Sequence, residues 1–151
     1  MTEQDPDLAS RARGALEVVC AGRLDQLAVF YDESFVDHVN AMVFHGHSGA
    51  RQSVGFYTSL FDPMRIEVED QVAGHDQVAS RWALYGTYRG REVILRGIVI
   101  SRFQNGRIIE DHSYTDSLAL PRALGVLRTG MLVADVLCGR VKLPRGALSH
   151  R

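Results

Sequence analysis

The sequence predicts an α+β domain in which helices come first and a curved antiparallel sheet follows. In the first sixty residues apolar side chains recur with the helical period of 3.6, and from Met64 onward the period changes to 2. Turn-forming residues separate the alternating runs, as in a meander of hairpins. At 151 residues, of which 46% are hydrophobic, the chain is long enough for one domain with a sizeable core.

The N-terminal part predicts three helices with a short strand and a loop between them. Residues 8–21 repeat apolar side chains at helical spacing, and Gly22 follows them as a C-cap. The pair Asp62-Pro63 stops the third helix, because a residue before proline disfavours the helical conformation. In order, we expect helices over 8–21 and 24–31, a strand over 35–39, a loop over 40–49 and a helix from 48 or 49 to 60.

Four long strands make up the second part. The strongest local signal is Asn105-Gly106 between two alternating runs, which is typical of a tight hairpin. The expected strands span 64–72, 78–88, 92–103 and 107–115, and a short helical turn follows over 118–124. Strands of this length twist, so the sheet is expected to wrap around the helices as a half-open cone. Small ligands usually bind in concave clefts of this kind.

Composition and charge exclude several classes of function. The 17 basic and 18 acidic residues form no long run of either sign, so we expect no nucleic-acid partner. No apolar stretch approaches the roughly 18 to 20 residues that span a bilayer, and the polar start of the chain is unlike a signal peptide. We therefore expect a cytoplasmic protein without a membrane partner, in which Cys20 and Cys138 are unpaired, buried thiols.

The fourth expected strand ends in an unusual cluster of ionisable and hydroxyl side chains. Strand alternation places its members on two faces. One face carries Asp111, Ser113 and Thr115, and the other carries Glu110, His112, Tyr114 and Asp116. A polar strand end of this kind is either a functional site or a solvent-exposed rim.

Several segments resemble one known family. They are Phe35-Val36-Asp37-His38, residues 78–90 around Arg81-Trp82, Arg102 to Glu110 with the sequence RFQNGRIIE, and Leu118 to Gly125 with the sequence LALPRALG. Their order and spacing over residues 8–125 resemble the SnoaL-like polyketide cyclases of the nuclear transport factor 2-like (NTF2-like) superfamily. The resemblance implies a cone-shaped α+β barrel, usually dimeric, with a hydrophobic pocket and neither a metal nor an organic cofactor.

The resemblance also defines the expected domain boundaries. Residues 8–125 form the SnoaL-like domain, and residues 1–7 precede it as a disordered N-terminus. Residues 126–151 form an apolar extension that lies outside the resemblance and can form a helix. Such a helix either covers the pocket of its own chain or crosses to a second subunit of the expected homodimer.

The chain departs from the family at its catalytic position. The cyclases carry a catalytic aspartate on the last long strand, where this chain has Ser113. Serine is a poor proton acceptor near neutral pH without a neighbouring base. Asp111 lies one pleat earlier on the same face, displaced by about 7 Å, and can replace that aspartate. We therefore expect Asp111 and His38 to be catalytic, although Asp111 could instead be a solvated strand-end carboxylate.

Four further residues are expected to bind the substrate. Ser113, Tyr57 and His45 offer polar groups, and Trp82 offers an aromatic surface on the inward face of its strand. His45 and His47 could also form a metal pair, but their spacing supplies no third ligand, so the interpretation preferred here is a lid loop without metal.

Two functions from different classes remain open at this point. The first is a small-molecule enzyme that transfers protons on an apolar carbonyl substrate, such as a polyketide cyclase, an isomerase or a dehydratase. The second is a non-catalytic protein that binds a small hydrophobic or aromatic ligand or acts as an accessory dimer. Burial of Asp111 inside an apolar cone would favour the first, since desolvation raises the pKa of a carboxyl toward neutrality.

Overall fold

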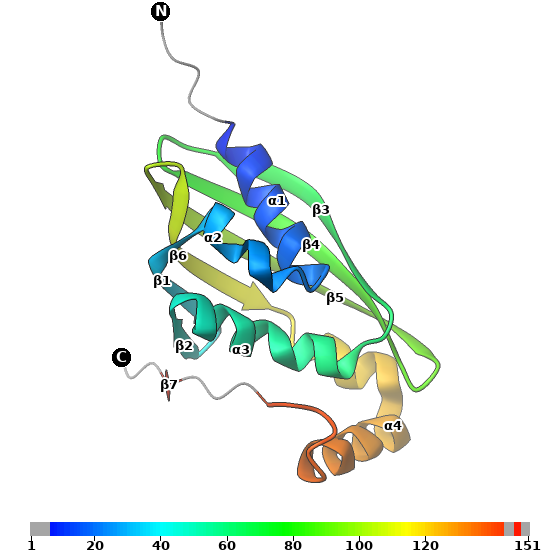
Figure 1. Cartoon of the computed structure of the whole chain (residues 1–151). Helices are drawn as coiled ribbons and strands as arrows, with labels where there is room; N and C mark the ends of the chain where they lie inside the picture. Colours follow the sequence, from blue (N-terminus) through cyan, green and yellow to red (C-terminus); the bar gives the residue numbers. More distant parts are fainter. Residues whose placement is uncertain (1–6, 144–146, 149–151) are drawn as a thin grey trace, which may run out of the picture.

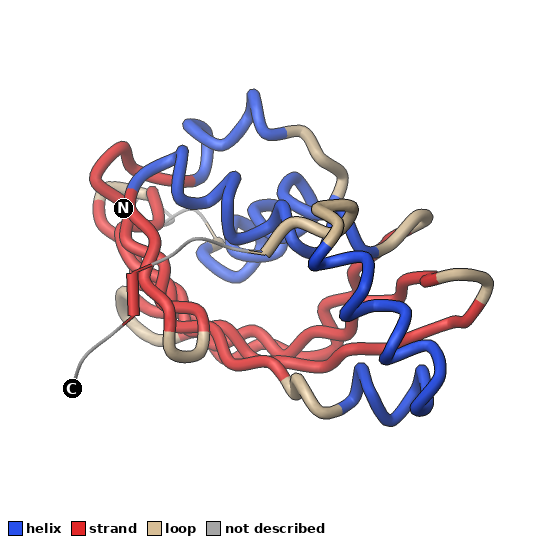
Figure 2. The backbone as a smooth tube through the Cα atoms, turned by 90° about the horizontal axis from the view of Figure 1, so that it is seen from below, coloured by secondary structure: helices blue, strands red, loops and turns tan. Residues whose placement is uncertain are grey.

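The computed structural model describes residues 7–143 and 147–148. Within these residues one curved sheet of seven strands has the order β3-β4-β5-β6-β1-β2-β7, and helices cover its concave face (Figure 1). Figure 2 shows the same arrangement from below, with the strands in one curved layer, most of the helices on one side of it and one helix running around its end. The strands β3 and β7 form the two edges, so the described sheet is an open cone, as the sequence predicts.

The first helices pack on the sheet. Helix α1 (Leu8–Cys20) begins at Asp7, whose side chain accepts a hydrogen bond from the backbone N–H of Ala9 at 3.2 Å. Asp7 is therefore an N-cap, whereas the rest of the expected disordered N-terminus, residues 1–6, lies outside the described residues. The predicted helix over 24–31 is instead a 3₁₀ turn, η1 (Leu24–Gln26), followed by α2 (Leu27–Phe30).

Strand β1 (Tyr31–Val39) joins the two halves of the chain. It is longer than predicted, and it pairs in parallel with β6 (Arg107–Thr115). In this register Asp37 lies beside Asp111. The side chain of Asn40 closes the pair at its far end, because it accepts a hydrogen bond from the N–H of Thr115 at 3.1 Å. Residues about seventy positions apart in the sequence thus become neighbours.

The predicted meander is confirmed. Strands β3 (Met64–Ala73), β4 (Gln77–Tyr88), β5 (Arg91–Gln104) and β6 pair antiparallel in sequence order. The turn between β5 and β6 is the predicted Asn105-Gly106 pair, with φ angles of 52° and 73°. Both angles are positive, as a two-residue hairpin turn of this type requires.

The predicted loop over 40–49 is wrong. Residues Met42–His45 form strand β2, which pairs with β1, and helix α3 (Gly46–Leu60) begins directly after it. The close packing of the two elements explains the difference. A Cβ atom at Gly49 would lie 2.9 Å from Phe44, so glycine is needed here for the helix to approach the strand closely. In the sequence, the same glycine makes the segment look like a loop.

The C-terminal extension is helical over most of its described length. Helix α4 (Ala119–Leu137) joins the predicted turn to the extension through a kink at Gly125, where φ is 71°. It packs against β5 of its own sheet, and Arg91 donates to the carbonyl of Ala123 at 3.1 Å. The chain then returns to the other edge, where β7 (Ala147–Leu148) pairs with β2 (Figure 1).

Two clusters of buried side chains form the core. The first joins α1 and α2 to β1 and includes Leu27, Tyr31 and Phe35. In the second, Leu124 and Leu132 of α4 join side chains of β4 and β5. Among the described helices, none is long and apolar enough to cross a bilayer.

Candidate functional site

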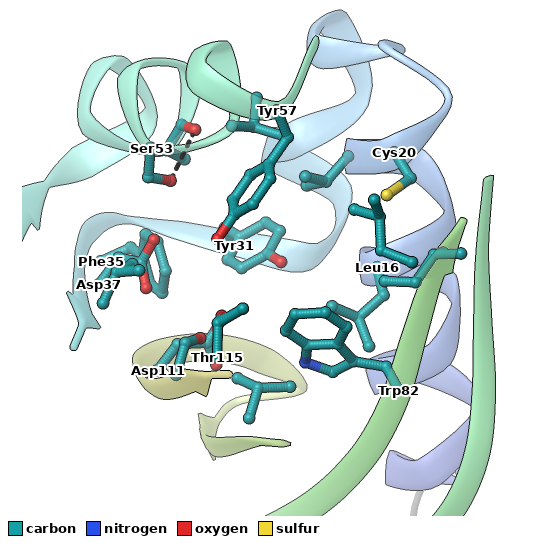
Figure 3. Close-up of a pocket in the computed structure, with 18 residues that line it drawn as sticks. Leu16, Cys20, Tyr31, Phe35, Asp37, Ser53, Tyr57, Trp82, Asp111 and Thr115 are labelled. Atoms are coloured by element: carbon teal, nitrogen blue, oxygen red, sulfur yellow. Dashed lines mark hydrogen bonds between the residues drawn. The ribbon is translucent and has the colours of Figure 1, made fainter. Parts of the chain in front are cut away.

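A cavity of about 110 Å³ lies inside the cone, between the two clusters (Figure 3). Its walls come from α1, α3 and strands β1 and β3 to β6, and most of the lining is apolar. Among the eighteen described lining residues, the only carboxyl groups are Asp37 and Asp111, and none is a lysine, an arginine or a histidine. The interior therefore offers acidic and hydroxyl groups in an apolar setting.

Asp111 is placed in this cavity by the alternation of β6. Its side chain is 6% exposed, and Ser113 and Thr115 line the cavity from the same face of the strand. Among the described residues, its Oδ1 atom has no hydrogen-bond partner. Buried polar atoms without partners are rare and costly, so this oxygen is available to a bound molecule.

Asp37 faces Asp111 from the neighbouring strand. Figure 3 shows both carboxyl groups on the same side of the cavity. Desolvation raises the pKa of Asp37 to about 6, although a hydrogen bond from Ser53 opposes the change. Desolvation and, second, the charge of Asp37 raise the pKa of Asp111 to about 8. In apolar surroundings the pair favours one ionised and one protonated carboxyl group near neutral pH.

Hydroxyl and aromatic groups complete the cavity. Tyr57 reaches from α3 into its centre with the phenol oxygen pointing inward (Figure 3). Burial raises the pKa of Tyr57, so its hydroxyl stays protonated and can donate a hydrogen bond. Ser113 and Trp82 also line the cavity, and Trp82 lies on the inward face of β4 as expected. The structure thus brings Asp111, Ser113, Tyr57 and Trp82 together.

Two of the expected site residues lie elsewhere. His38 follows Asp37 on β1, so its side chain points to the outer face of the sheet, where it contacts Glu110 and His112. His45 is exposed at the end of β2. The prediction that His38 and His45 lie in the pocket is therefore wrong. On β1, the side chain that points inward is that of Asp37.

The sequence contained the signal for Asp37. In a strand over 35–39, alternation puts Phe35, Asp37 and Val39 on one face, and an aromatic and an aliphatic residue favour the inward face. All three line the cavity. His47, the other histidine of the expected loop, is in the first turn of α3, where its Nε2 lies 3.0 Å from the carbonyl oxygen of Tyr31.

The thiols are unpaired, as expected, but only one is sheltered. Cys20 lines the cavity, and burial raises its pKa to about 11, so it remains a neutral wall residue. Cys138 follows α4 and is exposed, so the expectation that it is buried is wrong.

An open cone of this topology, with polar groups at the centre of an apolar cavity, defines an NTF2-like protein. The sequence matches the family model of the SnoaL-like polyketide cyclases over residues 10–124. This match spans most of the chain, and the chain belongs to that family. No curated protein was found to match the sequence.

Solved structures agree with this classification. IdmH from Streptomyces antibioticus, a candidate polyketide cyclase, is 23% identical with a TM-score of 0.73, covering 80% of this chain and 100% of that chain. A SnoaL-like polyketide cyclase from Agrobacterium tumefaciens is 24% identical with a TM-score of 0.68, over 80% and 100% of the two chains. TsrD from Streptomyces laurentii is 20% identical with a TM-score of 0.71, over 83% and 100%. At these identities the likeness shows a common fold.

Proposed function

We propose that this chain is an enzyme that transfers protons on a small, apolar substrate containing a carbonyl group. One observation carries the proposal: a carboxyl oxygen of Asp111 without a described partner faces an apolar cavity, directly beside a second carboxyl group. A group buried without compensation lowers stability, and such groups are concentrated at functional sites. Membership of a cyclase family supports the same reaction class.

The two carboxyl groups have different roles in this proposal. Because two neighbouring carboxylates in apolar surroundings do not both ionise readily, one stays protonated. Asp37, with the lower pKa, is the base that removes a proton from the carbon next to the carbonyl. Asp111, with the higher pKa, donates its proton to the carbonyl oxygen, and an enol forms.

The same two groups complete an aldol-type cyclisation. The enol carbon attacks a second carbonyl carbon of the substrate, and a carbon–carbon bond forms. The new alkoxide takes the proton held by Asp37, and the enol hydroxyl returns its proton to Asp111 as the first carbonyl is restored. Both carboxyl groups are then as they began. Isomerisation and dehydration share the first step.

The cavity walls indicate the substrate class. Without a basic side chain among the described lining residues, the site favours a neutral ligand over an anionic one. Tyr57 and Ser113 can hold a substrate oxygen by hydrogen bonds, while Trp82 and the aliphatic walls contact an apolar or aromatic ring. The proposed ligand is therefore a neutral aromatic or polyketide-like ketone.

A second candidate function is non-catalytic binding of a hydrophobic ligand. Two points favour it: by the resemblance, Ser113 stands where the family has its catalytic aspartate, and the cavity, at about 110 Å³, is small. In that case the acidic pair would only orient a ligand. Binding and proton transfer therefore have to be measured separately.

Deuterium exchange separates the two functions. The α-hydrogens of 2-tetralone, an aromatic ketone, exchange with D₂O after enolisation, and NMR follows their loss. We expect the wild-type chain to accelerate the exchange, and we expect Asp111→Asn to reduce that acceleration by about 100-fold or more. Binding is followed independently by the fluorescence of Trp82, the only tryptophan of the chain.

Asp116→Asn is the matched control. Asp116 follows the same strand, but its carboxylate is exposed and faces Arg122 at 3.8 Å. This variant should exchange the α-hydrogens of 2-tetralone at the wild-type rate. If Asp111→Asn stays folded by circular dichroism and keeps the full acceleration, the assignment of Asp111 is wrong. If the wild-type chain binds 2-tetralone without accelerating exchange, the binding function is favoured.

A further inference from the structure

Three side chains that the proposed reaction does not use converge on the outer face of the sheet. His38 of β1 and His112 of β6 are direct partners in the parallel register, and their rings stack at 4.3 Å between centroids. Glu110 lies two residues before His112, on the same face. Its Oε1 atom is 3.3 Å from Nε2 of His38 and 3.4 Å from Nε2 of His112.

We propose that His38, Glu110 and His112 form a binding site for a divalent transition metal ion, with Zn²⁺ as the best match. The three ligand atoms lie within 4.8 Å of one another. Two imidazoles and one carboxylate are a common zinc ligand set, with bond lengths of about 2.0 to 2.2 Å. Ligands of a tetrahedral ion at that distance are about 3.3 Å apart, which matches both of the separations between glutamate and histidine.

The surroundings hold the carboxylate in place for this role. Arg102 of β5 donates to the other oxygen of Glu110, Oε2, at 2.7 Å. This contact orients the carboxylate and leaves Oε1 directed at the two imidazoles, as outer-shell partners of metal ligands usually do. The strands hold the backbones of His38 and His112 in a hydrogen-bonded register. Because the two rings lie parallel, with an interplanar angle of 0°, one imidazole has to turn about its side-chain bonds for both Nε2 atoms to bind the same ion.

The exposure of the cluster leaves room for a fourth ligand. The three side chains are about one quarter to one third exposed, so water can complete a tetrahedral shell. Nitrogen ligands select transition metals, whereas Mg²⁺ and Ca²⁺ prefer oxygen. Because the cluster lies on the opposite face of the sheet from the cavity, this site is separate from the proposed proton transfer.

The sequence did not indicate this site, because its ligands come from distant segments. Glu110 and His112 share a face at a spacing of two, but the third ligand is 72 positions earlier and arrives through the parallel pairing of β1 with β6. The histidine pair considered from spacing, His45 and His47, lies elsewhere: His45 ends β2, and His47 contacts the carbonyl of Tyr31.

Isothermal titration of the full chain with ZnCl₂, after removal of any affinity tag, tests the proposal. We expect one Zn²⁺ per chain, and a dissociation constant raised by about 10-fold or more in His38→Gln, His112→Gln and Glu110→Gln. His45→Gln is the matched control, since it removes an exposed histidine from the neighbouring strand and should leave the dissociation constant unchanged. MgCl₂ at the same concentration should give no binding.

Absence of Zn²⁺ binding to the wild-type chain would overturn the proposal. So would binding that His38→Gln and His112→Gln leave unchanged in folded protein, or that Mg²⁺ reproduces. X-ray absorption at the zinc edge of the wild-type complex gives a readout that does not depend on the folding of the variants. A spectrum that shows scattering from two imidazoles supports the site. A spectrum that shows only oxygen ligands around the zinc contradicts it.

Discussion

The acidic pair of the cavity shows how a single residue position changes the chemistry of a strand. On β1, the neighbours Asp37 and His38 point to opposite faces of one sheet, and only Asp37 lines the cavity. On β6, the same alternation separates Asp111 from His112. One residue of shift in either strand would exchange the two sets of side chains, since strand faces alternate strictly.

Much of the site was accessible from the sequence at this scale. The faces of β6 and the inward direction of Trp82 follow from alternation, and the structure agrees with both. The prediction that His38 lies in the pocket is wrong, because His38 follows Asp37 in the strand and alternation turns the two side chains to opposite faces. Chemical suitability does not determine the direction of a side chain, whereas the pattern of Phe35 and Val39 does.

Gly97 controls the shape of the cavity wall. It pairs with Trp82 across β4 and β5, and a Cβ atom there would overlap the indole ring and lie 2.5 Å from the carbonyl oxygen of Tyr114. We predict that Gly97→Ala lowers the free energy of unfolding by about 1 to 3 kcal/mol, because the crowded wall has to shift. Urea denaturation measures this loss, and the fluorescence maximum of Trp82 should move with it.

Gly55→Ala provides the comparison for this prediction. Gly55 lies within α3, and no described atom is within 4 Å of its added Cβ. Alanine is more favourable than glycine in a helix interior, so the free energy of unfolding of this variant should rise by about 0.5 to 1 kcal/mol. Equal effects of the two substitutions would contradict the role given to Gly97.

At the scale of elements, a buried carboxylate with two partly exposed arginine partners fastens α4 to the hairpin between β4 and β5. Asp135 of α4 is 6% exposed and accepts hydrogen bonds from Tyr88 at 2.7 Å and from Arg89 at 2.9 Å. Arg140 approaches it at 3.3 Å. A buried carboxylate with several donors fixes the position of the helix, because removing its partners would leave the charge uncompensated.

The Asp135 cluster gives a pH-dependent prediction. Hydrogen bonds from Arg89 and Tyr88 lower the pKa of Asp135 to about 2, below its ordinary value of 3.8. Its stabilising contribution is therefore complete above about pH 4 and is lost as the pH falls through 2. We predict that Asp135→Asn melts at a lower temperature than wild type at pH 6, and that this difference in Tm shrinks at pH 3 and below.

The exposed pair between Asp116 and Arg122 is the control for that measurement. Its 3.8 Å contact lies in solvent near the start of α4, so Asp116→Asn should change Tm little at either pH. A difference in Tm for Asp135→Asn that stays constant between pH 6 and pH 3 would argue against an ionised Asp135 as the source of the stability.

Elements differed in how well the sequence predicted them. The long strands β3 to β6 carry repeated alternation and clear turn residues, so their bounds agree closely with the prediction. Strand β2 has four residues, too few for a period to emerge, and its pairing with β1 decides its conformation. The join of two helical segments across Gly125 in α4 likewise depends on packing against β5.

At the scale of the whole molecule, the outer face of β5 and β6 exposes apolar side chains. Ile94, Ile98 and Ile100 are 37–39% exposed, and Tyr114 is 55% exposed. We predict that this face pairs with a second copy of the chain, as the resemblance implies. In such a dimer the proposed zinc ligands would lie next to the interface, because Ile100 pairs with His112. Light scattering after gel filtration should then give twice the 16.8 kDa of one chain, and Ile98→Glu should give a monomer.

The exposed side of helix α4 is the alternative location for the dimer interface. Leu127 is 72% exposed there, and Leu127→Glu should leave the dimer intact if the interface lies on the sheet. If Leu127→Glu gives a monomer and Ile98→Glu remains a dimer, the interface lies on α4 and not on the sheet. If the wild-type chain is still a monomer at protein concentrations about 100-fold above those used in the deuterium-exchange assay, the prediction of a dimer is wrong.

The parallel pairing of β1 with β6 makes the acidic pair a measure of complete folding. Asp37 and Asp111 belong to segments synthesised far apart, and all of β3, β4 and β5 lies between them in the chain. A fragment that ends before β6 holds one carboxyl group and an unfinished sheet. The acidic pair of the cavity should therefore form only after the last long strand docks.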